Sequence, residues 1–315
     1  MRGLSMLPAY IYLLSFTLLP PVALGVNDRP IIGIITQEVS DEVFFQYGKT
    51  YIADSYVNFL ESAGSRVVPI RLNLSIDEYI HLFNSINGVL LPGGAVNLLR
   101  SSFTRTAGIF YRLAIEAASS GTYFPIWGTC MGFQVLTALT SGENLLCKTA
   151  ANNMSLPLIL ADDVSSSRMF RHAPLELLHA AAKENITANF HNFGITPETF
   201  HTNEKLSAFY RILSTNHDQH GVEFISTMEA RDYPIYGVQW HPEASRFQWR
   251  RDLAYPHSVN AIWMSQYIAN FFVNEARKNS NHFSNPKEEE SSLIYNRPLT
   301  YTANISGYEQ VYFFD

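Results

Sequence analysis

The most informative stretch of this chain is Phe124-Pro125-Ile126-Trp127-Gly128-Thr129-Cys130-Met131-Gly132. A short apolar run that ends in Gly-x-Cys-x-Gly is typical of a buried strand, a sharp turn and a helix that begins at once. The glycines allow the strained turn and let the helix pack close to the strand, so that the side chain between them stands at the tip. Because this tip lies at a helix N-terminus, the helix dipole favours the thiolate over the thiol. The stretch predicts that Cys130 is a nucleophile.

A base is predicted at the end of a second apolar run, residues 236–240, which is followed by His241-Pro242-Glu243. His241 would lie at the carboxyl end of a strand, where open α/β sheets collect catalytic groups. Imidazole titrates near neutrality, so it can pair with a thiolate and then protonate a leaving amine. Glu243 would orient the ring. We expect Cys130, His241 and Glu243 to form a triad that is suited to acyl transfer.

A third buried strand is predicted to run into a turn at Leu90-Leu91-Pro92-Gly93-Gly94. Backbone N–H groups of Gly93, Gly94 or Ala95, together with that of Met131, would form an oxyanion hole for a tetrahedral intermediate. Pro-Gly-Gly is also an ordinary turn sequence, so this motif alone is weak evidence. Its occurrence together with the other two motifs gives it weight.

The three motifs, in this order, resemble those of class I glutamine amidotransferases. Wider stretches are similar to the animal γ-glutamyl hydrolase family, which trims poly-γ-glutamate tails from folates; they are residues 29–34, 124–130, 223–229, 236–243 and 272–279. The resemblance implies a three-layer α/β fold with a mostly parallel central sheet flanked by helices. It also implies that Cys130 is the nucleophile, His241 the general acid and base, and Glu243 the third member, with no cofactor and with a homodimer as the assembly.

The implied substrate, a poly-γ-glutamyl folate, carries a row of α-carboxylates, so a cleft with cationic or N–H donors is expected. The predicted contacts are Gly93, Gln134, Arg168 and His172, although Gln134 stands where some γ-glutamyl hydrolases carry Glu. Arg171 and Lys49 are further candidates for binding carboxylates. Each of these residues, like Arg168, could instead be a solvated surface residue with no role in binding. Aromatic residues at 44–51 and 247–249 would stack on the pterin ring or pack in the core. His191 is a further histidine that would line the cleft.

Residues 1–25 indicate a secretory signal peptide, with Arg2, an apolar run at 7–19 and Ala23-Leu24-Gly25 as the cleavage signal. Residues 26–315 are then expected to form a single catalytic domain. Four N-glycosylation sequons begin at Asn73, Asn153, Asn185 and Asn304. With the family resemblance, these features predict a secreted and lysosomal glycoprotein.

Composition excludes several other classes of function. A net charge of -6 and a pI near 5.9 provide no basic surface for nucleic acid. No segment after the leader is long and apolar enough for a membrane helix. No histidine spacing matches a zinc pattern, so no metal is expected. Cys130 and Cys147 are the two cysteines; a bridge between them would remove the nucleophile, and Cys147 is expected to be a buried free thiol.

Strands alternate with helices along the chain, which predicts a parallel sheet covered on both faces. Residues 149–202 show no clear helix or strand pattern. The polar run 278–292 is expected to be solvated. Residues 308–314 are expected to pack back against the domain as a short strand. The expected strands are 31–36, 65–70, 88–91, 124–127, 211–214, 222–228 and 236–240, and the expected helices are 51–63, 76–84, 105–118, 133–140 and 258–279.

Two other functions stay open on the residues alone. A glutamine amidotransferase or free glutaminase would use the same nucleophile and release ammonia, but nothing in the chain resembles a synthase that would receive it. A non-catalytic secreted binding protein could keep the same fold, because fold alone does not establish activity. The presence of both Cys130 and His241 disfavours this second alternative.

Overall fold

The computed structural model describes residues 26–315, so the predicted signal peptide lies outside the described residues. Its centre is an eight-stranded sheet in the order β4-β1-β5-β6-β12-β11-β10-β8. The first five strands are parallel: β4 (Arg66–Ile70), β1 (Ile31–Ile35), β5 (Val89–Leu91), β6 (Ile126–Thr129) and β12 (Ile235–Val238). The antiparallel strands β11 (Glu223–Ala230), β10 (Tyr210–His217) and β8 (Ile159–Leu160) extend it. The predicted α/β class with a mostly parallel central sheet is confirmed.

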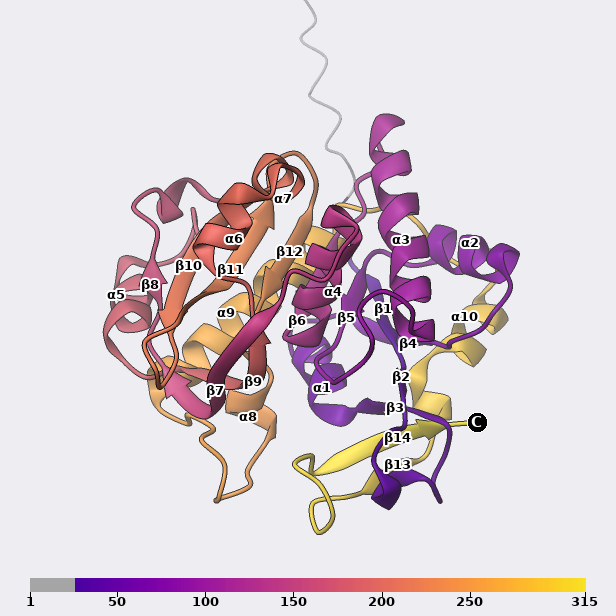
Figure 1. Ribbon diagram of the computed structural model, residues 1–315. Helices are drawn as coiled ribbons and strands as arrows, with labels where there is room; N and C mark the ends of the chain where they lie inside the picture. The colour runs from indigo at the N-terminus through magenta and orange to yellow at the C-terminus, as the bar shows by residue number, and fades with distance from the viewer. Residues whose placement is uncertain (1–25) are drawn as a thin grey trace, which may run out of the picture.

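Helices cover both faces of this sheet (Figure 1). One face packs against α1 (Asp54–Glu61), α5 (Leu175–Lys183) and α9 (Val259–Ala276). The other packs against α2 (Ile76–Ser85), α3 (Ser102–Ser119), α4 (Met131–Ser141), α6 (Pro197–Thr202) and α7 (Glu204–Phe209). Side chains alternate between the two cores: Ile32 and Ile34 of β1 enter the first, and Ile31 and Ile35 enter the second. This two-sided burial explains the continuous apolar runs of the parallel strands.

Two smaller sheets flank the carboxyl ends of the parallel strands. One has the order β13-β14-β3-β2 and joins β2 (Gln37–Glu38) and β3 (Thr50–Ala53) to the chain end, β13 (Leu299–Tyr301) and β14 (Gln310–Phe314). The other is a ribbon of β7 (Cys147–Leu156) and β9 (Thr187–Gly194). The predicted return of residues 308–314 as a strand is therefore confirmed, and it places the C-terminal segment next to β3.

One prediction about local structure is wrong. Residues 51–53 form part of β3 before α1 begins at Asp54, because they pair with β2 and β14; their apolar side chains fit a strand as well as a helix. The polar run, expected to be solvated, contains the helix α10 (Pro286–Ser292), in which no residue is buried and which is held by ion pairs from Glu288 to His81 and from Glu289 to Arg66. The expected helix 76–84 is α2, which begins with a capping box of Ser75 and Glu78. Within residues 26–315, none of the helices has the length and apolar character needed to cross a membrane.

The close approach of α4 to β5 can be tested at Gly132. A Cβ at this position would lie 2.1 Å from the carbonyl oxygen of Leu91, and neither backbone can move away cheaply. We expect Gly132→Ala to lower the free energy of unfolding by about 2–3 kcal/mol, as overpacking does. Gly121→Ala is the control, because a Cβ there would meet nothing within 4 Å and would add only the strain of a φ of +81°. Equal losses in urea unfolding for the two variants would contradict the steric explanation.

Candidate active site

The predicted turn between β6 and α4 places Cys130 at its tip. The residue has φ 51° and ψ −105°, a conformation that non-glycine residues adopt only under strain. Its backbone N–H donates to the carbonyl of Val238 at 2.8 Å, which ties the turn to β12. A Cβ at Gly128 would lie 2.6 Å from the carbonyl carbon of Gly132, so neither glycine can be replaced without moving the helix. The thiol is 5% exposed at the first turn of the helix.

His241 and Glu243 follow the carboxyl end of β12 and meet side by side. Nδ1 of His241 lies 2.7 Å from Oε1 of Glu243, which is fully buried. The backbone N–H of His241 donates to the carbonyl of Ala188 on β9 at 2.8 Å and holds the loop in place. Cys130 adjoins the same ring, since both side chains lie against Gly93. The three predicted residues therefore form one row of sulfur, imidazole and carboxylate.

The charge state of the row follows from its surroundings. Burial by itself lowers the pKa of His241, but the charges of Glu243 and Cys130 and their hydrogen bonds outweigh it and raise the pKa from 6.5 to about 10. The ring is therefore an imidazolium at neutral and acid pH. His191 on β9 lies nearby with its pKa lowered to about 4, by burial and then by the charge of His241, so it stays neutral. An imidazolium held by a carboxylate can pair with a thiolate, which is the nucleophilic form of cysteine.

Tyr56 on α1 belongs to this site although no sequence pattern indicated it. Its hydroxyl accepts a hydrogen bond from the N–H of Gly93 at 2.8 Å and lies 3.4 Å from Nδ1 of His241. A Cβ at Gly93 would lie 2.7 Å from Cε1 of His241 and 3.3 Å from the Cβ of Cys130. Gly93 is thus in direct contact with the catalytic pair, and glycine is required there by lack of space.

The groups predicted for the oxyanion hole come from two segments, the turn after β5 and the start of α4. Met131 is the first residue of α4, so its N–H has no partner within the helix. Gly94 has φ +156° and lies in the turn after β5. Gly94 and Ala95 border two hollows, one of about 390 Å³ beside His241 and one of about 340 Å³ beside Met131 and Gln134. A substrate amide held against this turn would extend into both hollows.

The two hollows differ in character. The one beside His241 is largely aromatic, with Phe44, Tyr51, Phe190, Tyr255 and Tyr308 among its lining residues. The one beside Gln134 contains Asn97, Asn144 and Phe193, and the Nε2 of Gln134 donates to the carbonyl of Phe193 at 2.9 Å. Among the residues that the structure describes, neither lining includes a lysine or an arginine. Of the lining residues, Phe190, Tyr255 and Tyr308 had no signal in the sequence.

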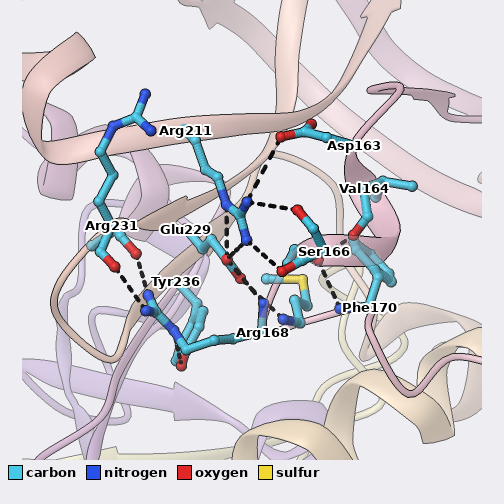
Figure 2. Close-up of polar contacts among 12 residues, drawn as sticks. Asp163, Val164, Ser166, Arg168, Phe170, Arg211, Glu229, Arg231 and Tyr236 are labelled. Carbon is cyan, nitrogen blue, oxygen red and sulfur yellow. Dashed lines mark hydrogen bonds and ion pairs between the residues drawn. The ribbon is translucent and has the colours of Figure 1, made fainter.

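Arg168 and His172, which the sequence also suggested as substrate contacts, lie elsewhere. The guanidinium of Arg168 is held beside the turn between β11 and β12, the opposite end of β12 from His241 (Figure 2). Its N–H groups are used by internal acceptors, which are the carbonyls of Ala230, Arg231 and Tyr233 and the hydroxyl of Tyr236. His172 is exposed and lines a separate cavity together with Arg168 and Arg171. The structure does not bring either residue to Cys130.

The remaining predicted positions are also located. All four sequon asparagines, Asn73, Asn153, Asn185 and Asn304, are exposed. Cys130 and Cys147 are both free, and Cys147 is half-buried rather than buried, with its Sγ 3.5 Å from the carbonyl oxygen of Gly194. Across residues 26–315, no group of three or more His, Cys, Asp or Glu side chains is arranged to hold a metal ion.

The fold and this row of residues define a class of protein, the cysteine-dependent hydrolases and acyl transferases with a histidine base. A family model for Peptidase C26 matches residues 30–243. The gamma-glutamyl hydrolase of Homo sapiens is 50% identical over 91% of this chain and 90% of that protein. Gamma-glutamyl hydrolase B of Dictyostelium discoideum is 39% identical over 97% of this chain and 88% of its own length.

A solved structure, the glutaminase domain of CTPS from Trypanosoma brucei with bound acivicin, is 15% identical and covers 80% of this chain and 96% of that chain with a TM-score of 0.49. The family follows from the curated relatives and the family model. The chain belongs to the Peptidase C26 family and is a hydrolase.

The role of Glu243 can be tested by its effect on pH dependence. Glu243→Gln removes the negative charge that raises the pKa of His241, so the imidazolium is lost at a lower pH. We expect the alkaline limb of kcat/KM to shift toward lower pH, with activity at neutral pH falling about 100-fold or more. The matched control is Glu229→Gln. This variant alters another buried carboxylate, which is paired with Arg211 and lies next to the start of β12, away from His241. An unshifted limb in the Glu243 variant would disprove the electrostatic role.

Proposed function

We propose that this hydrolase cleaves γ-glutamyl bonds of folate and antifolate poly-γ-glutamates through a thioester on Cys130. One observation carries the proposal. The buried row of Cys130, His241 and Glu243 occurs in a chain that is 50% identical to gamma-glutamyl hydrolases over about nine-tenths of its length. Peptide hydrolysis by such a row needs neither metal nor cofactor.

The geometry supports a two-step reaction. The thiolate of Cys130 attacks the γ-amide carbonyl, and the developing oxyanion accepts hydrogen bonds from the N–H groups of Gly94 and Met131. The imidazolium of His241 gives its proton to the leaving amine as the C–N bond breaks, which leaves an acyl thioester. His241, now neutral, takes a proton from water, whose oxygen attacks the thioester; the C–S bond breaks, releasing the γ-carboxylic acid and restoring the thiolate and the imidazolium. Glu243 keeps the ring oriented in both steps.

The two hollows on either side of Gly94 suit the two sides of the scissile bond. Because their linings hold no lysine or arginine among the described residues, we propose that N–H, amide and hydroxyl groups bind the substrate carboxylates. Gly93 and Gln134 remain proposed contacts, since Gly93 lies in this turn and Gln134, on α4, lines the hollow beside Met131. Arg168 and His172 are not proposed, because they face a different cavity.

The rival function, a glutaminase or glutamine amidotransferase, uses the same chemistry on a smaller substrate. It is not favoured, since the curated relatives compared above are gamma-glutamyl hydrolases. A non-catalytic binding role is not favoured either, because the catalytic row is intact.

We also propose the setting in which the enzyme works. Residues 1–25 act as a signal peptide, residues 26–315 form one catalytic domain, and the product is secreted or delivered to lysosomes. The exposed positions of the four sequon asparagines support glycosylation at Asn73, Asn153, Asn185 and Asn304. A homodimer is proposed from the family resemblance.

The proposed chemistry predicts that Cys130→Ala abolishes hydrolysis of a pteroylpolyglutamate, because no other thiol adjoins His241. Cys147→Ala, at the half-buried second cysteine, should retain activity close to that of the native enzyme. Chromatographic separation of shortened pteroylglutamates measures the reaction, and ammonia release from free glutamine measures the rival one. Turnover by the Cys130 variant, or a preference for glutamine, would refute the proposal.

The proposed setting predicts a secreted, glycosylated product when the full chain is expressed in animal cells. Treatment with peptide N-glycosidase should increase its electrophoretic mobility, and replacing all four sequon asparagines by Gln should remove that increase. Deleting residues 1–25 should keep the protein inside the cell and unglycosylated. A native chain that stays in the cytosol would contradict this setting.

A further inference from the structure

Gln37 lies just after the carboxyl end of β1 and has no role so far in the site. It is 2% exposed, so its carboxamide is buried. Its Nε2 donates a hydrogen bond to the carbonyl oxygen of Gly93, and its Oε1 accepts one from the hydroxyl of Tyr51 at 3.3 Å. A Cβ at Gly94 would lie 1.7 Å from Oε1 of Gln37. The carboxamide is therefore packed directly against the Gly93–Gly94 peptide group.

The peptide group between these two glycines consists of the C=O of Gly93 and the N–H of Gly94. In a trans peptide the C=O and the N–H point in opposite directions. A donor that holds the carbonyl of Gly93 on one side therefore directs the N–H of Gly94 to the other side. The preceding peptide is held separately, because the N–H of Gly93 donates to Tyr56 at 2.8 Å. The two peptide groups that flank Gly93 are thus each anchored by one buried side chain.

An anchor is needed because the turn is made of glycines. Without a Cβ, Gly93 and Gly94 can adopt several backbone conformations at little cost, including a flipped peptide between them. A flip would point the carbonyl oxygen toward the thiolate and remove the N–H from the oxyanion. Glycine cannot be replaced by a stiffer residue, since a Cβ would collide with His241 at one position and with Gln37 at the other.

We propose that Gln37 is a positioning residue that locks the Gly93–Gly94 peptide so that the Gly94 N–H faces the oxyanion. This inference rests on the proposed function, in which that N–H stabilises the tetrahedral intermediate. The hydrogen bond from Nε2 also polarises the peptide, which strengthens its N–H as a donor. Gln37 acts through the backbone and touches no reacting atom.

The test is Gln37→Glu, which preserves size and shape but replaces the N–H donor by a carboxyl group. As a carboxylate, the new group cannot donate to the Gly93 carbonyl. We expect kcat for pteroylpolyglutamate hydrolysis to fall about 10- to 100-fold at neutral pH, less than for complete loss of an oxyanion donor, with KM little changed. Once protonated, the new carboxyl can donate again, so the deficit should shrink as the pH falls through its pKa, which burial raises.

The ratio of variant to native kcat is compared at each pH, because the titratable side chains around the turn, Cys130, His241, Tyr51 and Tyr56, are present in both proteins. Gln37→Met, which can never donate, should keep its deficit at every pH. Asn87→Asp is the matched control. It changes another buried amide that donates to backbone carbonyls, those of Asn279 and Asn281, at the amino end of β5, and it should alter stability but not kcat.

A Gln37→Glu enzyme with native kcat at neutral pH, or with a deficit that acid does not relieve, would overturn the positioning role. If that variant does not fold, Gln37→Met serves instead. It removes the donor without introducing a charge, and it should lower kcat about 10- to 100-fold with KM little changed; an unchanged kcat would then count against the proposal. Failure of the native enzyme to cleave the substrate would instead refute the proposed function.

Discussion

The buried carboxylate of Glu243 is the constraint on which the rest of the site depends. It is fully buried, its Oε1 lies 2.7 Å from His241, and its Oε2 has no hydrogen-bond partner among the described residues. A buried charge without compensation is very costly, so the neighbouring imidazole must carry the opposite charge. One buried carboxylate therefore determines the protonation of the imidazole beside it.

The parallel sheet brings these groups together from distant parts of the chain. Cys130 follows β6, His241 follows β12, Gly93 follows β5 and Gln37 follows β1. These four strands are neighbours in the sheet, and their carboxyl ends meet at one edge. The order of the strands thus places the proposed anchor, oxyanion turn, nucleophile and base on four successive strands. No single loop carries the site.

Motifs at strand ends were the part of this arrangement that the sequence could predict. The apolar runs identified the strands, and the residues directly after them, Cys130, His241 and Gly94, lie together in the structure. Gln37 shares this signal, as a polar residue just after a buried strand, but a single glutamine is too common to be singled out. Tyr56 has no such signal, because it is a helix residue whose hydroxyl happens to reach Gly93.

Arg168 was wrongly predicted to contact the substrate, because arginine is a residue type that binds carboxylates. In the structure its N–H groups donate hydrogen bonds to backbone carbonyls at the turn before β12 (Figure 2). Likewise, residues 149–202 could not be ordered, because β7 and β9 pair as a ribbon outside the main sheet and have mixed burial on both faces.

The absence of lysine and arginine from the linings of both hollows, in the part of the chain that is described, has a consequence for specificity. The enzyme has a net charge of -6, so long-range attraction does not favour a polyanionic substrate. Recognition must then come from short-range donors, the N–H, amide and hydroxyl groups near Gly94. Buried donors that are left unpaired cost free energy, so a ligand without matching acceptors is rejected strongly. A cleft whose described lining has no lysine or arginine therefore selects the proposed substrate by the positions of short-range donors, the imidazolium of His241 among them, rather than by the total charge of the substrate.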